Sequence, residues 1–109
     1  MASELMKRTL TNGVTNSESV LINGVSGKTY IILSVIITET AGAAETVDLY
    51  IDASGGGTDT EILSDQALGA NETFVFNDRI IIEDTDHLCA ATASSANVDI
   101  TVNYVEQTR

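Results

Sequence analysis

The chain has 109 residues, and 16 acidic against 5 basic side chains give it a formal net charge of -11 at pH 7. This length suits one domain, and a composition of 43% hydrophobic and 19% charged residues is typical of a folded protein. Between Thr29 and Thr108 the only base is Arg79, so the surface should repel phosphate backbones and anionic membranes. We therefore expect neither nucleic acid nor a membrane as a partner.

Residues 1–6 are predicted to form a short N-terminal arm without the apolar run of a signal peptide, so we expect synthesis in the cytoplasm. Residues 7–109 are predicted to form a single domain, in which strand-like runs alternate with turn signals such as Asn23–Gly24. The expected strands are 7–14, 19–22, 29–40, 45–53, 60–63 with a segment around 67–68, 72–76, 79–83, 87–93 and 97–105.

Two kinds of pattern occur among these runs. The run 29–40 is apolar on both faces in its first half, which places it at the centre of a sheet. The runs 45–53 and 97–105 alternate between apolar and polar residues, which indicates one buried and one solvated face. Alternating strands must hide one face, so we expect an all-β fold. The prediction is an antiparallel, jelly-roll-like β-sandwich of about eight strands, and the order of the strands does not follow from the sequence.

Reactive residue types are rare in this chain. His87 and Cys89 are the only histidine and the only cysteine, and their i, i+2 spacing places them on one face of a strand. A Cys–His nucleophile needs a third orienting group and an oxyanion site, and zinc needs three or four ligands, which Asp84 or Asp86 would have to complete. The favoured interpretation is an apolar Cys89 beside a His87 at a loop edge.

Clusters of acidic residues raise the question of calcium, because calcium binds oxygen ligands in flexible geometry. The clusters are Asp52, Asp59 and Glu61 around the loop 54–57, and Glu83, Asp84 and Asp86 in one turn. Neither has the pattern of an EF-hand, so solvated turn acids are the favoured interpretation and calcium stays an open question. The sequence predicts no catalytic residue, no cofactor site and no metal site, and hence a protein that is not an enzyme.

Turn phrases between Tyr30 and Glu106 carry a resemblance to a known type of protein. They are GGTD at 56–59, LGANET at 68–73 and SSAN at 94–97. With the strand runs between them, they resemble small structural proteins of tailed-bacteriophage virions. One departure is the turn 83–88, EDTDHL, which lacks the glycine that this family often has there.

The resemblance implies a protein without catalytic residues that sits in a virion. Its first implied role is that of a decoration or cement protein on the capsid exterior, which bridges subunits and forms a homo-oligomer, with a trimer favoured. The alternative role is in the tail or fibre, where binding of host glycans is an additional expectation. The implied partners are the major capsid protein or other virion proteins.

Five residues are candidates for contacts in such an assembly. Leu5, Lys7 and Arg8 lie in or beside the N-terminal arm, which either contacts the shell or a neighbour or is a frayed terminus. Tyr50 and Tyr104 are expected either as exposed interface anchors, a role in which tyrosine is enriched, or as caps on the core.

Overall fold

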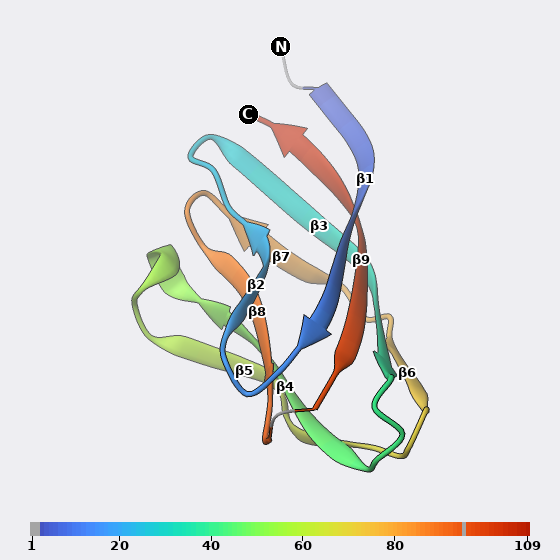
Figure 1. Ribbon diagram of the computed structural model, residues 1–109. Helices are drawn as coiled ribbons and strands as arrows, with labels where there is room; N and C mark the ends of the chain where they lie inside the picture. Colours follow the sequence, from blue (N-terminus) through green and yellow to red (C-terminus); the bar gives the residue numbers. More distant parts are fainter. Residues whose placement is uncertain (1–2, 95) are drawn as a thin grey trace.

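A computed structural model describes residues 3–94 and 96–109 and contains nine β-strands in that part of the chain (Figure 1). The strands are β1 (Ser3–Val14), β2 (Ser19–Asn23), β3 (Lys28–Glu39), β4 (Glu45–Asp52), β5 (Asp59–Leu68), β6 (Thr73–Phe76), β7 (Ile80–Glu83), β8 (His87–Thr92) and β9 (Val98–Thr108). A short 3-10 turn, Ala53–Gly55, follows β4. Among the described residues no helix is long and apolar enough to cross a membrane.

The strands form two antiparallel sheets. Sheet A has the order β1-β9-β3, with β6 and β7 both on the far side of β3, and sheet B has the order β2-β8-β4-β5. β7 pairs with residues 29–32 of β3 and β6 with residues 35–38, so the two short strands share one position in the sheet. When β6 and β7 are counted as one strand, the strand orders of sheets A and B are those of a jelly roll. The prediction of an all-β, jelly-roll-like sandwich is therefore confirmed.

The core lies between the sheets and is built from the apolar positions of the alternating runs. β3 has the central place that its pattern predicts, with β9 on one side and β6 and β7 on the other. Fully buried side chains from both sheets meet here, among them Ile32, Val35, Ile37, Val47, Leu49, Leu88, Ile100 and Val102. This aliphatic core needs no tryptophan, because stiff β-branched side chains pack well on pleated surfaces.

The beginning of the chain differs from the prediction. Residues 3–6, expected within an arm, are the first part of β1, and Ser3 to Met6 pair with Thr108 to Val105 of β9. The pairing extends both strands beyond the range that their side-chain patterns indicate, because the edge of β9 offers backbone groups that need partners. Side chains at 3–8 are nevertheless exposed. Residues 1–2 lie outside the described part of the chain.

The turn between β7 and β8 forms without the glycine that the resemblance leads one to expect. Asp84 adopts a φ of 52°, a left-handed conformation that aspartate tolerates better than most residues. Its carboxylate accepts a hydrogen bond from the Gly27 N–H at 2.9 Å and pairs with the Arg109 guanidinium. These contacts tie the turn to the end of the sandwich where both described termini lie (Figure 1).

Candidate functional site

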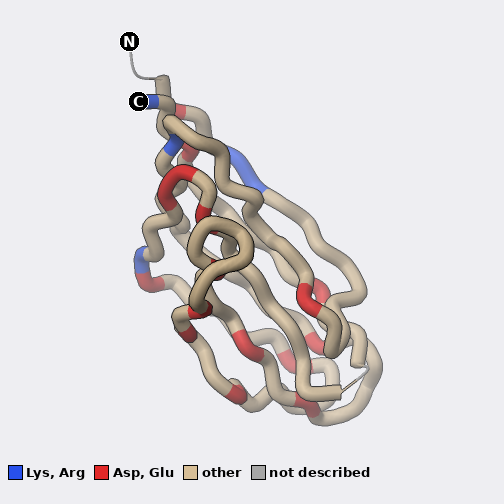
Figure 2. Tube along the Cα trace, turned by 90° about the vertical axis from the view of Figure 1, so that its left-hand side faces the viewer, with Lys and Arg blue, Asp and Glu red and all other residues tan. Residues whose placement is uncertain are grey.

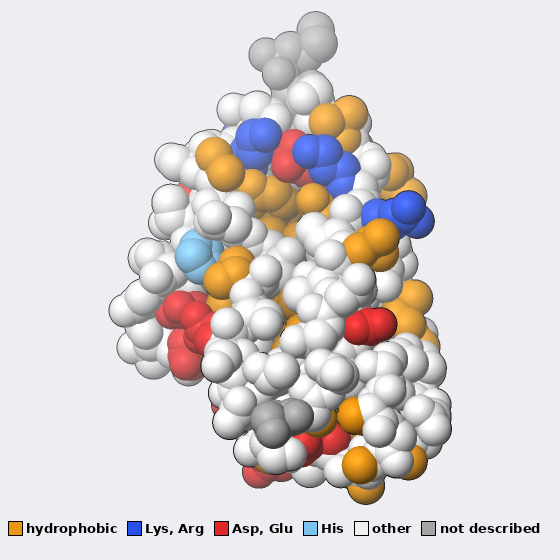
Figure 3. Space-filling model, in the orientation of Figure 1, with side chains coloured by type: hydrophobic (Ala, Val, Ile, Leu, Met, Phe, Trp, Pro, Cys, Tyr) orange, Lys and Arg blue, Asp and Glu red, His pale blue; other side chains and the backbone are white. Residues whose placement is uncertain are grey.

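A buried carboxylate lies at the end of sheet A near the termini. Glu106 is 7% exposed, and its oxygens lie 3.1 Å from Lys28 Nζ and 3.4 Å from Lys7 Nζ. The hydrogen bond from Lys28 and the nearby Lys7 hold the pKa of Glu106 below its usual value, although burial opposes them. Figure 3 shows basic side chains flanking an acidic one near the upper end of the molecule.

The candidate residues are distributed over two parts of the molecule. Leu5 and Lys7 lie opposite Glu106 and Tyr104 on the inner side of the β1–β9 ladder, and Leu5 is 50% exposed. Arg8 follows on the outer side, opposite Asn103. Tyr50 lies on the other sheet, where its hydroxyl donates a hydrogen bond to Glu18 at 2.5 Å.

The two tyrosines are buried within the chain itself. Each is only 8% exposed, so the expectation of exposed rings is wrong. Tyr104 belongs to the core cluster, and its ring centroid lies 6.0 Å from that of Tyr30, in a tilted arrangement that is favourable for aromatic pairs. The part that Leu5, Lys7, Arg8 and the tyrosines play in an assembly stays a prediction.

The outer face of sheet A is the largest feature that the sequence prediction missed. Cross-strand pairing places Met6, Val105, Ile31 and Ile81 side by side in one row across four strands. A second, parallel row contains Leu10, Thr101, Ile36 and Val75. Met6 is 78% exposed and Ile81 47% exposed. We call the apolar members of both rows the apolar face: Met6, Leu10, Ile31, Ile36, Val75, Ile81 and Val105.

The sequence held a signal for this face. The residues of β3 are apolar on both sides, and so are Ile80, Ile81 and Ile82 of β7. This pattern led to the prediction of a central strand, which normally has cover on both faces. In the described part of the chain, sheet B covers the inner side of β3, while Ile31 and Ile36 on the outer side stay partly exposed. Met6 was not predicted to belong to a sheet, because it falls within the predicted arm.

Charge is distributed unequally between the two outer faces. Arg8 lies between the two rows of the apolar face, and Glu4 and Glu83 lie at its margin. The strands of sheet B contain no lysine or arginine, and their outer side carries acidic residues, among them Asp48 and Asp52. Figure 2 shows most of the basic residues toward the end with the termini, while acidic residues extend over the whole length.

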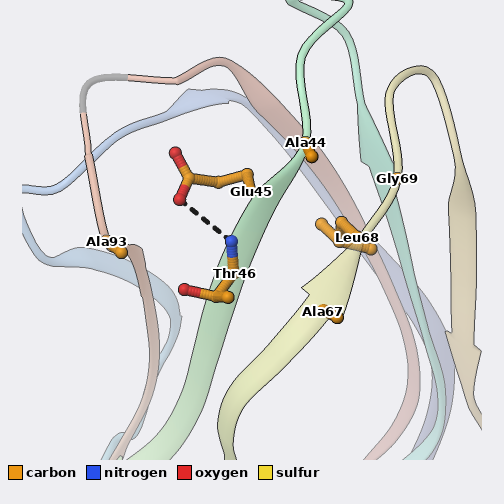
Figure 4. Close-up of a pocket in the computed structure, with 7 residues that line it drawn as sticks. All are labelled: Ala44, Glu45, Thr46, Ala67, Leu68, Gly69 and Ala93. Atoms are coloured by element: carbon orange, nitrogen blue, oxygen red, sulfur yellow. Dashed lines mark hydrogen bonds between the residues drawn. The ribbon is translucent and has the colours of Figure 1, made fainter.

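A shallow depression of about 550 Å³ lies at the opposite end of the molecule (Figure 4). It is lined by Ala44, Glu45, Thr46, Ala67, Leu68, Gly69 and Ala93. Its one carboxylate, Glu45, accepts hydrogen bonds from the Ser94 hydroxyl and the Thr46 N–H, which lower the pKa of Glu45. Because the remaining lining is mostly small and apolar, the depression lacks the converging polar groups of a specific ligand site.

His87 and Cys89 do share a strand face, but their acidic neighbour is neither Asp84 nor Asp86. It is Asp52, and one potential ligand atom from each of the three residues lies within 4.8 Å of the others. Cys89 is fully buried, and burial followed by the charge of Glu18 raises the pKa of its thiol to about 12. A buried, protonated thiol is a poor nucleophile, so this arrangement is not that of a cysteine hydrolase.

Comparison with known proteins identifies the fold but no family. No family model and no curated protein matches the chain. Among solved structures, a chain of the acid-stable capsid of Helicobacter pylori bacteriophage KHP30 has a TM-score of 0.59 at 12% identity and covers 100% of this chain and 99% of its own. A chain of the disulfide-linked pili of Bacillus endospore appendages has a TM-score of 0.55 at 11% identity, covering 99% and 90%.

A third similar structure comes from the T13 particle of infectious bursal disease virus. Its TM-score is 0.52 at 8% identity, and the match covers 97% of this chain but only 35% of the viral one. At such identities the likeness shows the fold alone. This jelly-roll-like sandwich is thus a fold shared with viral capsid proteins and with an appendage pilus.

Proposed function

We propose that this chain is a non-enzymatic structural protein of a bacteriophage virion. In this proposal it is a decoration or cement protein on the capsid exterior that self-associates and bridges capsid subunits. The observation that carries the proposal is the apolar face, because an uncovered row of four apolar side chains is a mark of an interaction surface. The match to a bacteriophage capsid chain over nearly the full length of both chains supports it.

A second copy of this chain is the occupant that we assign to the apolar face. Two molecules with a net charge of -11 repel each other, so copies should meet where charge is lowest. The apolar face fits this requirement, because its seven members are uncharged and Arg8 between its rows offsets part of the charge of the acids at its margin, Glu4, Glu83 and Asp99. The outer side of sheet B, with its unbalanced acids, would be the least favourable place for such contact.

The dimensions of the molecule allow such an interface. Its extents are 47 × 27 × 20 Å, so its broad side has room for the roughly 800 Å² per partner that a standard interface buries. On a shell, many copies of a weak contact add up, because each bound copy raises the effective concentration for the next one. A modest contact between copies is therefore sufficient for a cement protein.

Replacing two exposed members of the apolar face tests the contact between copies. We expect the double variant Met6→Ser, Ile81→Ser to self-associate at least about tenfold more weakly than the wild type, because each buried apolar side chain contributes roughly 1.5 kcal/mol or more. Sedimentation equilibrium measures the change. The matched control is Val25→Ser, since Val25 is 51% exposed but lies in the loop after β2. Equal weakening in both variants, or no self-association of the wild type, would contradict the assignment.

The location in the particle is tested by immunogold electron microscopy of purified particles of the source virus. We expect label from an antibody against this chain over the whole head. Label confined to one vertex or the tail would overturn the cement role in favour of a tail or fibre protein with glycan binding. Absence of label from intact and opened particles would overturn the virion assignment altogether.

A further inference from the structure

The outer side of sheet B brings three metal-ligating side chains together. Asp52 of β4 lies directly opposite His87 of β8, and residues in that relation have neighbouring side chains on one face. Cys89 is two residues further along β8 and so shares this face. The strand pairing therefore gathers a carboxylate, an imidazole and a thiol from two positions that are 35 residues apart in the sequence.

Asp52 supplies an independent sign that a ligand belongs here. Its side chain is 6% exposed, and among the residues that the structure describes its Oδ1 has no hydrogen-bond partner. Burial of an unpaired carboxylate oxygen is costly, because the oxygen loses its water without replacement. Buried charges in proteins are normally paired or coordinate a metal. A cation at this oxygen would satisfy it.

The surrounding electrostatics also favour a cation. Asp59 of β5 lies directly opposite Asp52, so two acidic side chains are neighbours on this face. Glu18 approaches from the loop between β1 and β2, where it accepts the hydrogen bond from Tyr50. In Figure 3 the histidine, in pale blue, lies at the surface of the molecule above a group of acidic side chains. A divalent ion would relieve the mutual repulsion of these carboxylates.

The turn after β4 fixes the imidazole of His87. Gly55 lies so close to this ring that a Cβ atom added to the glycine would be 2.7 Å from His87 Cε1. A side chain at this position would displace the ring, and the φ of 67° of Gly55 also favours glycine. The Ser54 N–H donates a hydrogen bond to Asp86 Oδ1 at 2.9 Å, which anchors the turn. The ring is thereby held beside Asp52 and Cys89 and partly shielded from solvent.

We propose that Asp52, His87 and Cys89 form a binding site for a divalent transition-metal ion of the zinc class. The donor set of one oxygen, one nitrogen and one sulfur is a set that zinc accepts, whereas calcium and magnesium prefer oxygen ligands alone. The three ligand atoms lie within 4.8 Å of one another. Small side-chain rotations bring them to the roughly 3.5 Å separations of a tetrahedral zinc site, in which water takes the fourth position.

Coordination of the metal would also change the protonation state of the Cys89 thiol. As the metal–sulfur bond forms, the S–H bond of Cys89 breaks and its proton passes to solvent, because a coordinating thiol is deprotonated. No oxidant or reductant takes part. The site would tie β4 to β8 across sheet B and hold the turn 53–57 in place. This role is independent of the proposed place in a virion.

Titration of the tag-free, full-length chain with Zn²⁺ and with Co²⁺ tests the site. We expect one ion per chain by calorimetry, a higher melting temperature with Zn²⁺, and a sulfur-to-Co²⁺ charge-transfer band in the near ultraviolet. Cys89→Ser should abolish the band, and Asp52→Asn should weaken Zn²⁺ binding by more than about tenfold. Glu83→Gln is the matched control, since Glu83 is exposed on the other sheet, and it should bind Zn²⁺ like the wild type.

Two results would overturn the proposal. One is the absence of both stoichiometric Zn²⁺ binding and the Co²⁺ band in the wild type, a measurement that needs no variant and so does not depend on the folding of one. The other is Zn²⁺ binding that is unchanged in Cys89→Ser and Asp52→Asn. Circular dichroism of each variant verifies that a loss of binding is not a loss of fold.

Discussion

Glu39 is a charged residue with only 1% of its surface exposed, at the last position of β3. Its carboxylate accepts hydrogen bonds from the N–H groups of Ala41, Gly42, Ala43 and Asn71, with N···O distances of 2.8 to 3.1 Å. The bond from Asn71 is the largest cause of the lowered pKa of Glu39, and burial opposes it. One side chain thus joins the loop after β3 to the turn before β6.

Replacing this carboxylate should destabilise the fold in a pH-dependent way. The lowered pKa means that the folded protein favours the charged form, so the stabilisation is present above the ordinary value of 4.5 and is lost as the pH falls through the folded-state pKa. We expect Glu39→Gln to lower the melting temperature by roughly 5 °C or more at pH 7, because the amide NH₂ cannot accept the N–H groups that the carboxylate binds. Thermal melts should show a smaller difference at acidic pH.

Glu61 provides a control of opposite sign. Burial and repulsion from Asp48, Asp59 and Asp65 raise its pKa, so its negative charge is unfavourable in the folded protein. Glu61→Gln should therefore leave the melting temperature at pH 7 unchanged or slightly higher. A drop in Glu61→Gln as large as that in Glu39→Gln would show that the loss of any glutamate has the same effect.

At the scale of elements, local sequence patterns predicted where most strands lie. The ends of β1 and β9 depend on pairing between distant parts of the chain, which local patterns do not show. Alternation and turn residues located every strand from β2 to β8 to within about two residues, apart from β5, which was predicted as two pieces. The largest differences are the start of β1 and the end of β9, where the two strands extend each other by pairing. No local signal reports a partner that is about a hundred residues away in the sequence.

The candidate sites were predicted only in part, because they too depend on contacts between residues that are far apart in the sequence. His87 and Cys89 could be placed on one face, because they belong to one strand. Asp52 could not be added, since its position opposite His87 depends on the order and register of β4 and β8. Glu39 lies at the polar end of the predicted strand 29–40, where no local pattern indicates that a glutamate is buried. Its burial results from a turn more than thirty residues later, at Asn71.

At the scale of the whole molecule, positive charge is concentrated near the end that holds the termini. Glu106 with its two lysines and Arg109 with Asp84 lie near the termini, and acidic residues are spread along the rest of the chain trace (Figure 2). Two modes of self-association are therefore conceivable for this charge distribution: contact between apolar faces, or contact between the basic end of one copy and the acidic body of the next. The two modes respond to salt in opposite directions.

Contact between apolar faces should become stronger as salt is added. When ionic strength rises from about 10 mM to about 150 mM, the Debye length falls from roughly 30 Å to 8 Å. The repulsion between two copies with a net charge of -11 is then screened, while apolar burial is largely unaffected. We expect the dissociation constant of the wild type, measured by sedimentation equilibrium, to fall severalfold over this range. A dissociation constant that rises instead would mean that opposite charges hold the copies together, and the apolar face would then need another partner.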